Sequence, residues 1–143
     1  MKHPRLLLIL VCAVVFLSGC ATQLTSNVTA GTNLADIKKL HVVRLPKDER
    51  NVDRIIAERL IAMGKQATSG ESTAAPADVD AIVTYQDKWM WDITMYMIEL
   101  NLQLRQPKTE IAIATGHSLR TSLVRKSPPE MVDEVLADIF KKR

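Results

Sequence analysis

A run of apolar residues near the start of the chain constrains most strongly what the rest can fold into. Residues 6–17 are all apolar, two basic residues precede them, and a Ser-Gly pair follows. A transmembrane helix needs about 20 apolar residues, so this run is too short to span a bilayer. The three features together are typical of a cleaved signal peptide rather than a buried core helix. The sequence therefore predicts a signal peptide over residues 1–19.

The tetrapeptide Leu17-Ser18-Gly19-Cys20 resembles the lipobox of bacterial lipoproteins. That resemblance implies a diacylglyceryl group on the Cys20 thiol, cleavage before Cys20, and acylation of the freed amine by a fatty acid such as palmitate. Two or more chains anchor a protein stably, because each buried CH₂ contributes about 0.8 kcal/mol. Ala21 stands where an Asp would favour the inner membrane. The resemblance thus implies a lipid anchor in the outer membrane, on its periplasmic face.

Both cysteines of the chain fall in this first part, Cys12 within the signal peptide and Cys20 at the lipid. The remaining body has no disulfide, cysteine nucleophile or cysteine zinc site, so its stability must come from its core. The full chain has a formal net charge of +3, and removal of the signal peptide takes away the positive charges of Lys2 and Arg5. Acidic and basic residues are interspersed without a basic stripe, which argues against nucleic-acid binding.

Residues 20–33 are rich in Thr, Ser, Asn and Gly and show no apolar period. Such a composition is typical of a flexible linker. We therefore expect a lipidated N-terminus and flexible tether over residues 20–33. A single globular domain should follow over residues 34–143.

Several segments have the composition or alternation of β-strands. Residues 37–45 and 81–86 are rich in β-branched residues, and residues 88–92 should interrupt the second strand. Strict alternation over residues 94–105 predicts a long strand with one face on the core and one on water or a partner. Residues 111–124 should form its antiparallel partner. One face of that partner is unusually small, with Ala112, Ala114, Gly116 and Ser118.

Two further segments have helical patterns. Residues 52–63 carry apolar residues at helical spacing, Asp48 or Asn51 is suited to the N-cap, and Gly64 is suited to the C-terminal end. Residues 127–130, Ser-Pro-Pro-Glu, form a capping box that opens the last helix. The apolar face of that helix should bury Met131, Val132, Val135, Leu136, Ile139 and Phe140.

These patterns predict the α+β fold class in the order β-α-(β)-β-β-β-α. The bracketed strand is a short edge strand over residues 66–68. We expect a mostly antiparallel sheet of four to five strands, with both helices packed on one face.

Trp89, Trp91 and Tyr85 form the candidate binding surface. If strand geometry continues through residues 88–92, both indoles lie on one face. In one interpretation they cap an end of the core, and their N–H groups find partners. In the other they form an exposed platform for a glycan, a lipid or a protein.

The sequence contains little evidence for a catalytic or metal-binding site. His41 and His117 lack the further ligands that a metal site needs at defined spacing. Ser118 or Ser122 could be combined with His117 and Asp87, but no GxSxG elbow accompanies them. We expect no catalytic residue, no metal and no cofactor.

Four aspartates lie close to the strand predicted over residues 81–86. Paired carboxylates can transfer protons or bind Ca²⁺, but the spacing of a calcium loop is missing. We expect turn and strand-end acids, because Asp favours turns. The four are Asp78, Asp80, Asp87 and Asp92.

The predicted order of elements resembles that of small lipoproteins of Gram-negative envelopes. It consists of a strand, a helix, long antiparallel strands and a last helix, with three short motifs among them. The motifs are Met63-Gly64, Ala77-Asp78 and Tyr85-Gln86-Asp87. The domain of such proteins is similar to the CsgG and TolB amino-terminal α/β fold, and its members serve as assembly factors, activators or accessory subunits. The resemblance implies a non-catalytic lipoprotein that binds an envelope protein. The alternative is a small-ligand or glycan-binding module using the Trp89 and Trp91 region.

Overall fold

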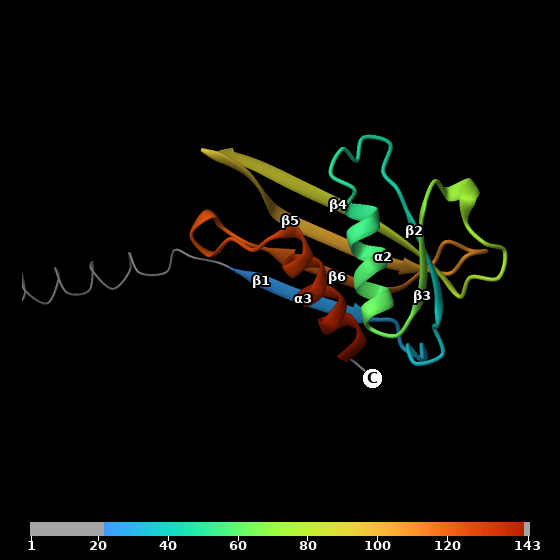
Figure 1. The fold of residues 1–143 in the computed structure, drawn as a ribbon. Coiled ribbons are helices and arrows are strands. Elements are labelled where there is room, and N and C mark those ends of the chain that lie inside the picture. Colours follow the sequence, from blue (N-terminus) through green and yellow to red (C-terminus); the bar gives the residue numbers. More distant parts are fainter. Residues whose placement is uncertain (1–21, 142–143) are drawn as a thin grey trace, which may run out of the picture.

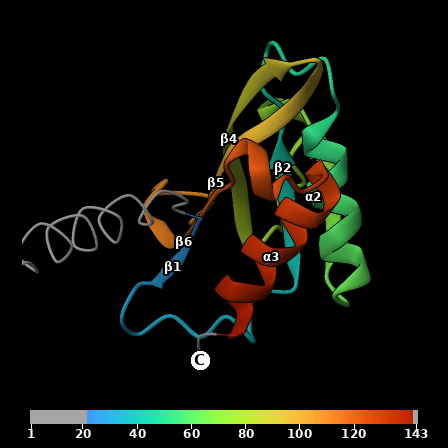
Figure 2. The same cartoon turned by 90° about the vertical axis from the view of Figure 1, so that its left-hand side faces the viewer.

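The computed structural model describes residues 22–141 as a six-stranded mixed sheet with two helices on one of its faces (Figures 1 and 2). The sheet order is β1-β6-β5-β4-β2-β3. The strands are β1 (Gln23–Val28), β2 (Lys39–Val43), β3 (Gln66–Gly70), β4 (Ala81–Asp92), β5 (Thr94–Arg105) and β6 (Ala112–Leu119). The helices are α2 (Val52–Ala62) and α3 (Pro128–Lys141). Residues 1–21, including Cys20 and the predicted signal peptide, lie outside the described residues.

The predicted α+β class is confirmed, but the predicted strand number and pairing are wrong. The sheet is mixed, since β2 runs parallel to both β3 and β4 while the remaining neighbours are antiparallel. For β2 and β3 the reason is α2, which lies between them in the chain. A helical crossover returns the chain to the same end of the sheet, so the two strands that it joins are parallel.

Residues 23–28 form an edge strand where the sequence predicts a flexible tether. β1 pairs antiparallel with β6 from Gln23 opposite Leu119 to Val28 opposite Ala114. Its polar composition suits an edge strand, because one face meets water and only one edge is paired. On the other face, the Ser26 hydroxyl donates to the Asp138 carbonyl of α3 at 3.1 Å. The globular domain therefore begins before residue 34.

The core lies between the helices and the middle of the sheet. Leu100, Leu102 and Leu104 of β5 are fully buried, as the alternation predicts. The small face of β6 lies under α3, and a Cβ on Gly116 would stand 2.6 Å from Val135 Cγ1. The small side chains thus let α3 pack closely on the sheet, while Ile111 on the predicted apolar side is exposed.

The predicted helix ends are largely confirmed. Glu130 accepts hydrogen bonds from the Ser127 N–H at 2.8 Å and from the Ser127 hydroxyl at 2.7 Å. Gly64 has φ 83° and ends α2 with the two backbone bonds of a Schellman motif, Gly64 N–H to Ile61 and Lys65 N–H to Leu60. The N-cap function at α2 is supplied by Asp48, whose Oδ2 accepts the Asp53 N–H at 3.2 Å.

Strands β4 and β5 continue together beyond the body of the sheet as a long hairpin (Figure 1). Their pairing runs to Asp92 opposite Thr94, with an irregularity between Lys88 and Trp89. The predicted interruption over residues 88–92 is therefore wrong. A β-bulge absorbs the irregularity, and the strand continues through it. No helix within residues 22–141 is long and apolar enough to cross a membrane.

Candidate functional site

Four of the ten exposed large apolar residues in the described part of the chain lie at the end of the β4–β5 hairpin. Met90, Trp91, Ile93 and Met95 are all exposed, with Trp91 at 68% and Ile93 at 88%. Trp91 and Met95 are cross-strand partners, and Ile93 occupies the turn between the strands. We call these four residues the apolar tip.

A short turn extends this surface. The η2 turn (Ser122–Val124) exposes Leu123 and Val124. It lies beside the hairpin because the neighbouring Arg125 donates from Nη2 to Asp92 at 2.8 Å. The Arg125 guanidinium also lies 4.0 Å from the centroid of the Tyr96 ring. Six exposed apolar side chains thus share one end of the molecule.

The two tryptophans of the predicted binding surface occupy different environments. Trp89 is half-buried against the core, its indole N–H donates to Asp87, and the Arg50 guanidinium lies 4.4 Å from its ring centroid. Trp91 projects beyond the body of the sheet. Trp89 therefore follows the core-capping interpretation, and Trp91 follows the exposed one.

Tyr85 lies in the core, so its placement on the predicted surface is wrong. Its hydroxyl donates to Asp48 Oδ2 at 2.7 Å and accepts the Leu45 N–H at 3.3 Å. Burial and the bond to the Asp48 carboxylate raise the pKa of Tyr85 above its ordinary value. Burial alone would raise the pKa of Asp48, but the bonds from Tyr85 and from backbone N–H groups hold it below its usual range. This pair fixes the start of α2 to β4 and is structural.

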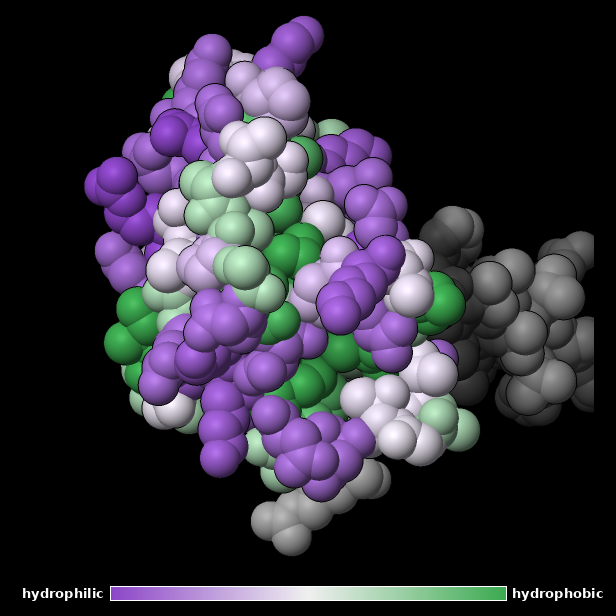
Figure 3. Space-filling model, turned by 90° about the vertical axis from the view of Figure 1, so that its right-hand side faces the viewer, coloured by the Kyte–Doolittle hydropathy of each residue, from purple (hydrophilic) through white to green (hydrophobic). Residues whose placement is uncertain are grey.

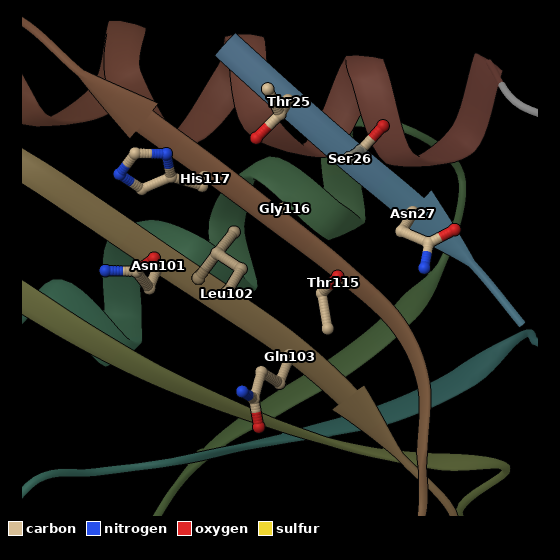
Figure 4. A pocket seen from close by; sticks show the side chains of 9 residues that line it. All are labelled: Thr25, Ser26, Asn27, Asn101, Leu102, Gln103, Thr115, Gly116 and His117. Atoms are coloured by element: carbon tan, nitrogen blue, oxygen red, sulfur yellow. The ribbon is translucent and has the colours of Figure 1, made fainter. Parts of the chain in front are cut away.

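The face of the sheet opposite the helices carries a polar surface. Thr25, Asn27, Asn101, Gln103, Thr115 and His117 point away from α3 around a shallow hollow of about 360 Å³ (Figure 4). They come from β1, β6 and β5, on the face of the sheet that neither helix covers (Figure 2). We call these six residues the open face. Sequence alternation identified its β5 part, but the β1 part was missed with that strand.

Side chains on and beside the open face bond to one another. His117 Nε2 lies 3.2 Å from Glu99 Oε1, and the side chains of Gln103 and Arg105 are hydrogen-bonded to each other. At the β2 end the connection between β3 and β4 covers the sheet. There His41 is only 1% exposed, and its ring nitrogens bond to Thr68 and to the Glu71 carbonyl. The open face is therefore confined to the β1, β6 and β5 end.

The residues considered for catalysis do not converge. His117 lies on the open face, whereas its neighbour Ser118 is buried on the helix side and donates to Glu134 at 2.5 Å. Asp87 bonds to Trp89, away from both. Within residues 22–141 no group of three or more His, Cys, Asp and Glu residues is placed to hold a metal ion.

The four aspartates also have separate partners. Asp78 pairs with Lys39, and Asp80 Oδ2 accepts the N–H groups of Lys38 and Lys39 at 2.8 Å each. These backbone bonds are the main cause that lowers the pKa of Asp80. Asp92 pairs with Arg125, as described above. Asp78, Asp80 and Asp92 therefore stabilise strand ends or turns, as expected, whereas Asp87 lies within β4 and bonds to Trp89.

The end of the molecule opposite the apolar tip has a different surface. Figure 3 shows hydrophilic residues over most of that end, with apolar residues between them in small groups. A pocket there of about 450 Å³ is lined by both kinds, including Val43, Pro76 and Arg105. The concentration of exposed apolar side chains is thus a property of the hairpin end.

No protein-family model matches this chain, and no curated protein matches it. Among solved structures it is similar to the PelC dodecamer of Paraburkholderia phytofirmans, with a TM-score of 0.61, 12% identity, and coverage of 83% of this chain and 98% of that one. A point variant of the same dodecamer gives a TM-score of 0.60 at 12% identity, over 86% and 100% of the two chains.

A PDZ domain protein of Parabacteroides distasonis gives a TM-score of 0.50 at 10% identity. The match covers 85% of this chain but 36% of that one. At these identities the three likenesses show the fold alone.

Proposed function

We propose that this chain is a non-catalytic lipoprotein of the Gram-negative outer membrane that faces the periplasm and binds an envelope partner. Residues 1–20 support the anchor, because they combine a basic start, an apolar run and the lipobox-like end at Cys20. The resemblance to small envelope lipoproteins of the CsgG and TolB amino-terminal type supports the accessory role.

The observation that carries the proposal is the distance between the anchor and the folded body. β1 begins at Gln23, only three residues after Cys20. Three extended residues reach roughly 10 Å at most. A protein held in this way stands directly on the membrane surface, with no spacer between the anchor and the sheet. Such a body acts where it is anchored, which fits a subunit of an envelope assembly.

The open face is the surface that we assign to the protein partner. Its six side chains are amides, hydroxyls and an imidazole, which donate and accept hydrogen bonds and suit the polar parts of an interface. The similar PelC structures are dodecamers, so further copies of this chain belong among the partners to be tested.

Site-specific photo-crosslinking in intact cells tests this assignment. A photoreactive amino acid at Gln103 lies on the open face, and the same group at the exposed Glu58 of α2 is the matched control on the helix side. We expect a discrete crosslinked product with an envelope protein or a second copy from position 103 only. Equal products from both positions, or none from position 103, contradict the assignment.

A second candidate function is the binding of a small polar ligand or a glycan. The hollow in Figure 4 favours it, because six hydrogen-bonding side chains surround a space of about 360 Å³. The predicted site at Trp89 and Trp91 receives less support, since Trp89 is half-buried. Titration of the protein with soluble envelope glycans, with Asn101→Ala as the comparison, distinguishes ligand binding from protein binding.

A further inference from the structure

We propose that the apolar tip is a second membrane contact, inserted at the lipid interface beside the anchor. The inference rests on the proposed function, because the membrane concerned is the one that holds Cys20. It adds an orientation, since two points of attachment fix how the body stands on the bilayer.

Exposed apolar residues are concentrated at this end of the molecule. Of the ten exposed large apolar side chains among residues 22–141, four form the apolar tip and two, Leu123 and Val124, lie on the adjacent η2 turn. Apolar residues scattered singly over a surface are normal, but a contiguous patch marks an interaction site. Transfer of this end of the molecule from water to an apolar environment is therefore favourable.

The apolar residues are distributed around the tip rather than along one side. Successive residues in a strand point to opposite faces, so Met90 and Trp91 project in opposite directions. Ile93 extends from the turn between them. A partner that docks against one side would leave the other side in water, whereas a lipid interface surrounds all of them. The arrangement therefore fits insertion better than side-on docking.

The residue in the turn acts against the stability of the hairpin. Ile93 has φ 61°, a left-handed conformation that disfavours β-branched side chains and is normally filled by Gly or Asn. Its side chain is also the most exposed large apolar group of the described residues, at 88%. Neither the turn nor the exposure to water favours isoleucine here. An apolar environment outside the fold accounts for it.

The strand register places the tip and the anchor at the same end of the sheet. Gln23 lies opposite Leu119, Leu119 opposite Glu99, and Glu99 opposite Lys88. From that row the hairpin continues for four further residues of β4, up to about 13 Å at strand spacing. Figure 1 places its tip beyond the start of β1.

These lengths bring the tip to the bilayer. The reach from Cys20 to Gln23 is at most roughly 10 Å, which is shorter than the projection of the hairpin beyond the same row. A body anchored so closely cannot hold its sheet end far from the lipid. The tip is the part that meets the lipid first.

Polar groups limit the depth of insertion. Asp92 lies next to Ile93 and is paired with Arg125, and Lys88 stands where the hairpin leaves the sheet. Burying an ion pair in hydrocarbon is unfavourable, so it should remain among the headgroups. Trp91 then lies at the interface, where tryptophan is enriched in membrane proteins. The tip is expected to dip into the lipid without crossing it.

Tryptophan quenching by brominated lipids tests the proposal on the whole protein. The chain has two tryptophans, so Trp89→Phe leaves Trp91 as the only reporter, and Trp91→Phe leaves the half-buried Trp89 as the matched control. Each variant is purified from membranes and reconstituted into phosphatidylethanolamine and phosphatidylglycerol vesicles. The lipids carry bromine either near the headgroup end of the acyl chain or near its middle.

We expect several-fold stronger quenching of Trp91 than of Trp89, and stronger quenching by the shallow bromines than by the deep ones. Ile93→Asp should reduce the quenching of Trp91 toward that of Trp89. Equal quenching of the two reporters overturns the proposal. So does protection of Trp91 without lipid quenching, combined with loss of an oligomer in Ile93→Asp, because the tip would then contact a second copy.

Intact-mass measurement of the same samples separates this inference from the proposed anchor. If Cys20 carries acyl chains but Trp91 is not quenched, the proposed anchor stands and the proposed insertion of the tip is wrong. Quenching of Trp91 in a protein without acyl chains retains the tip as a membrane contact and rejects the anchor. The two proposals can therefore fail independently.

Discussion

The close packing of α3 on β6 predicts that Gly116→Ala destabilises the protein. The added Cβ would lie 2.6 Å from Val135 Cγ1 and 2.8 and 2.9 Å from two Ile139 side-chain carbons. Carbon atoms pack at about 3.5–4.0 Å, so α3 or both side chains must move. Overpacking of this kind costs about 1–3 kcal/mol. Replacing a strand glycine by alanine stabilises by about 0.5–1 kcal/mol. Since three contacts fall below 3.0 Å, we place the overpacking cost at the upper end, about 2–3 kcal/mol, and expect a net loss of about 1–2.5 kcal/mol.

Urea unfolding in a double-mutant cycle measures this effect. Val135→Ala removes the Cγ1 atom that the new Cβ meets most closely and leaves the two Ile139 contacts, so the penalty of Gly116→Ala should be smaller in that background. Thr115→Ala, one residue away on the open face, is the control and should change stability by about 0.5 kcal/mol or less. Wild-type stability in Gly116→Ala, or the same penalty in both backgrounds, would refute the packing argument.

Three further variants test other parts of the fold by the same unfolding assay. Glu134 accepts bonds from Arg120, Lys126 and Ser118, so Glu134→Gln should cost about 2–4 kcal/mol at neutral pH. Burial would raise the pKa of Glu134, but these bonds hold it below the ordinary 4.5, so wild type should lose stability as pH falls below about 4.5 while the Gln variant loses less. Equal acid sensitivity would contradict this assignment. Tyr85→Phe should cost about 1–2 kcal/mol, because Asp48 and the Leu45 N–H lose their partner, and an unchanged midpoint would show that water replaces the hydroxyl. Ile93→Gly should stabilise the hairpin by about 1 kcal/mol while weakening the contact with vesicles, and a loss of stability would remove the evidence of turn strain.

Features encoded within a few neighbouring residues were predictable from the sequence. The capping box at residues 127–130, the glycine that ends α2 and the alternation along β5 each depend on local spacing, and each is found in the structure. The buried face of α3 follows for the same reason, since helical periodicity shows which side is apolar.

Features that depend on distant pairing were not predictable. β1 has the composition of a linker and becomes a strand only because β6 offers it an unpaired edge. The parallel pairing of β2 with β3 depends on the path of the chain through α2, and that of β2 with β4 on the connection after β3; no local pattern records either path. Long-range contacts of this kind decide the topology.

The sequence predicts one environment for Trp89 and Trp91, and the structure shows two. The spacing of Trp89 and Trp91 placed both indoles on one face, but spacing does not show where the body of the protein ends. The core ends between them, so Trp89 is covered by Arg50 and Trp91 is not. The chemistry of Ile93 emerged only when its left-handed backbone was seen, because an isoleucine in a turn gives no recognised motif.

The intact mass of the protein purified from its native membranes shows whether Cys20 carries the lipid anchor. We predict a chain that has lost residues 1–19 and carries acyl chains on Cys20, and a Cys20→Ser variant without that added mass. An unmodified precursor recovered from the envelope at full mass would contradict it.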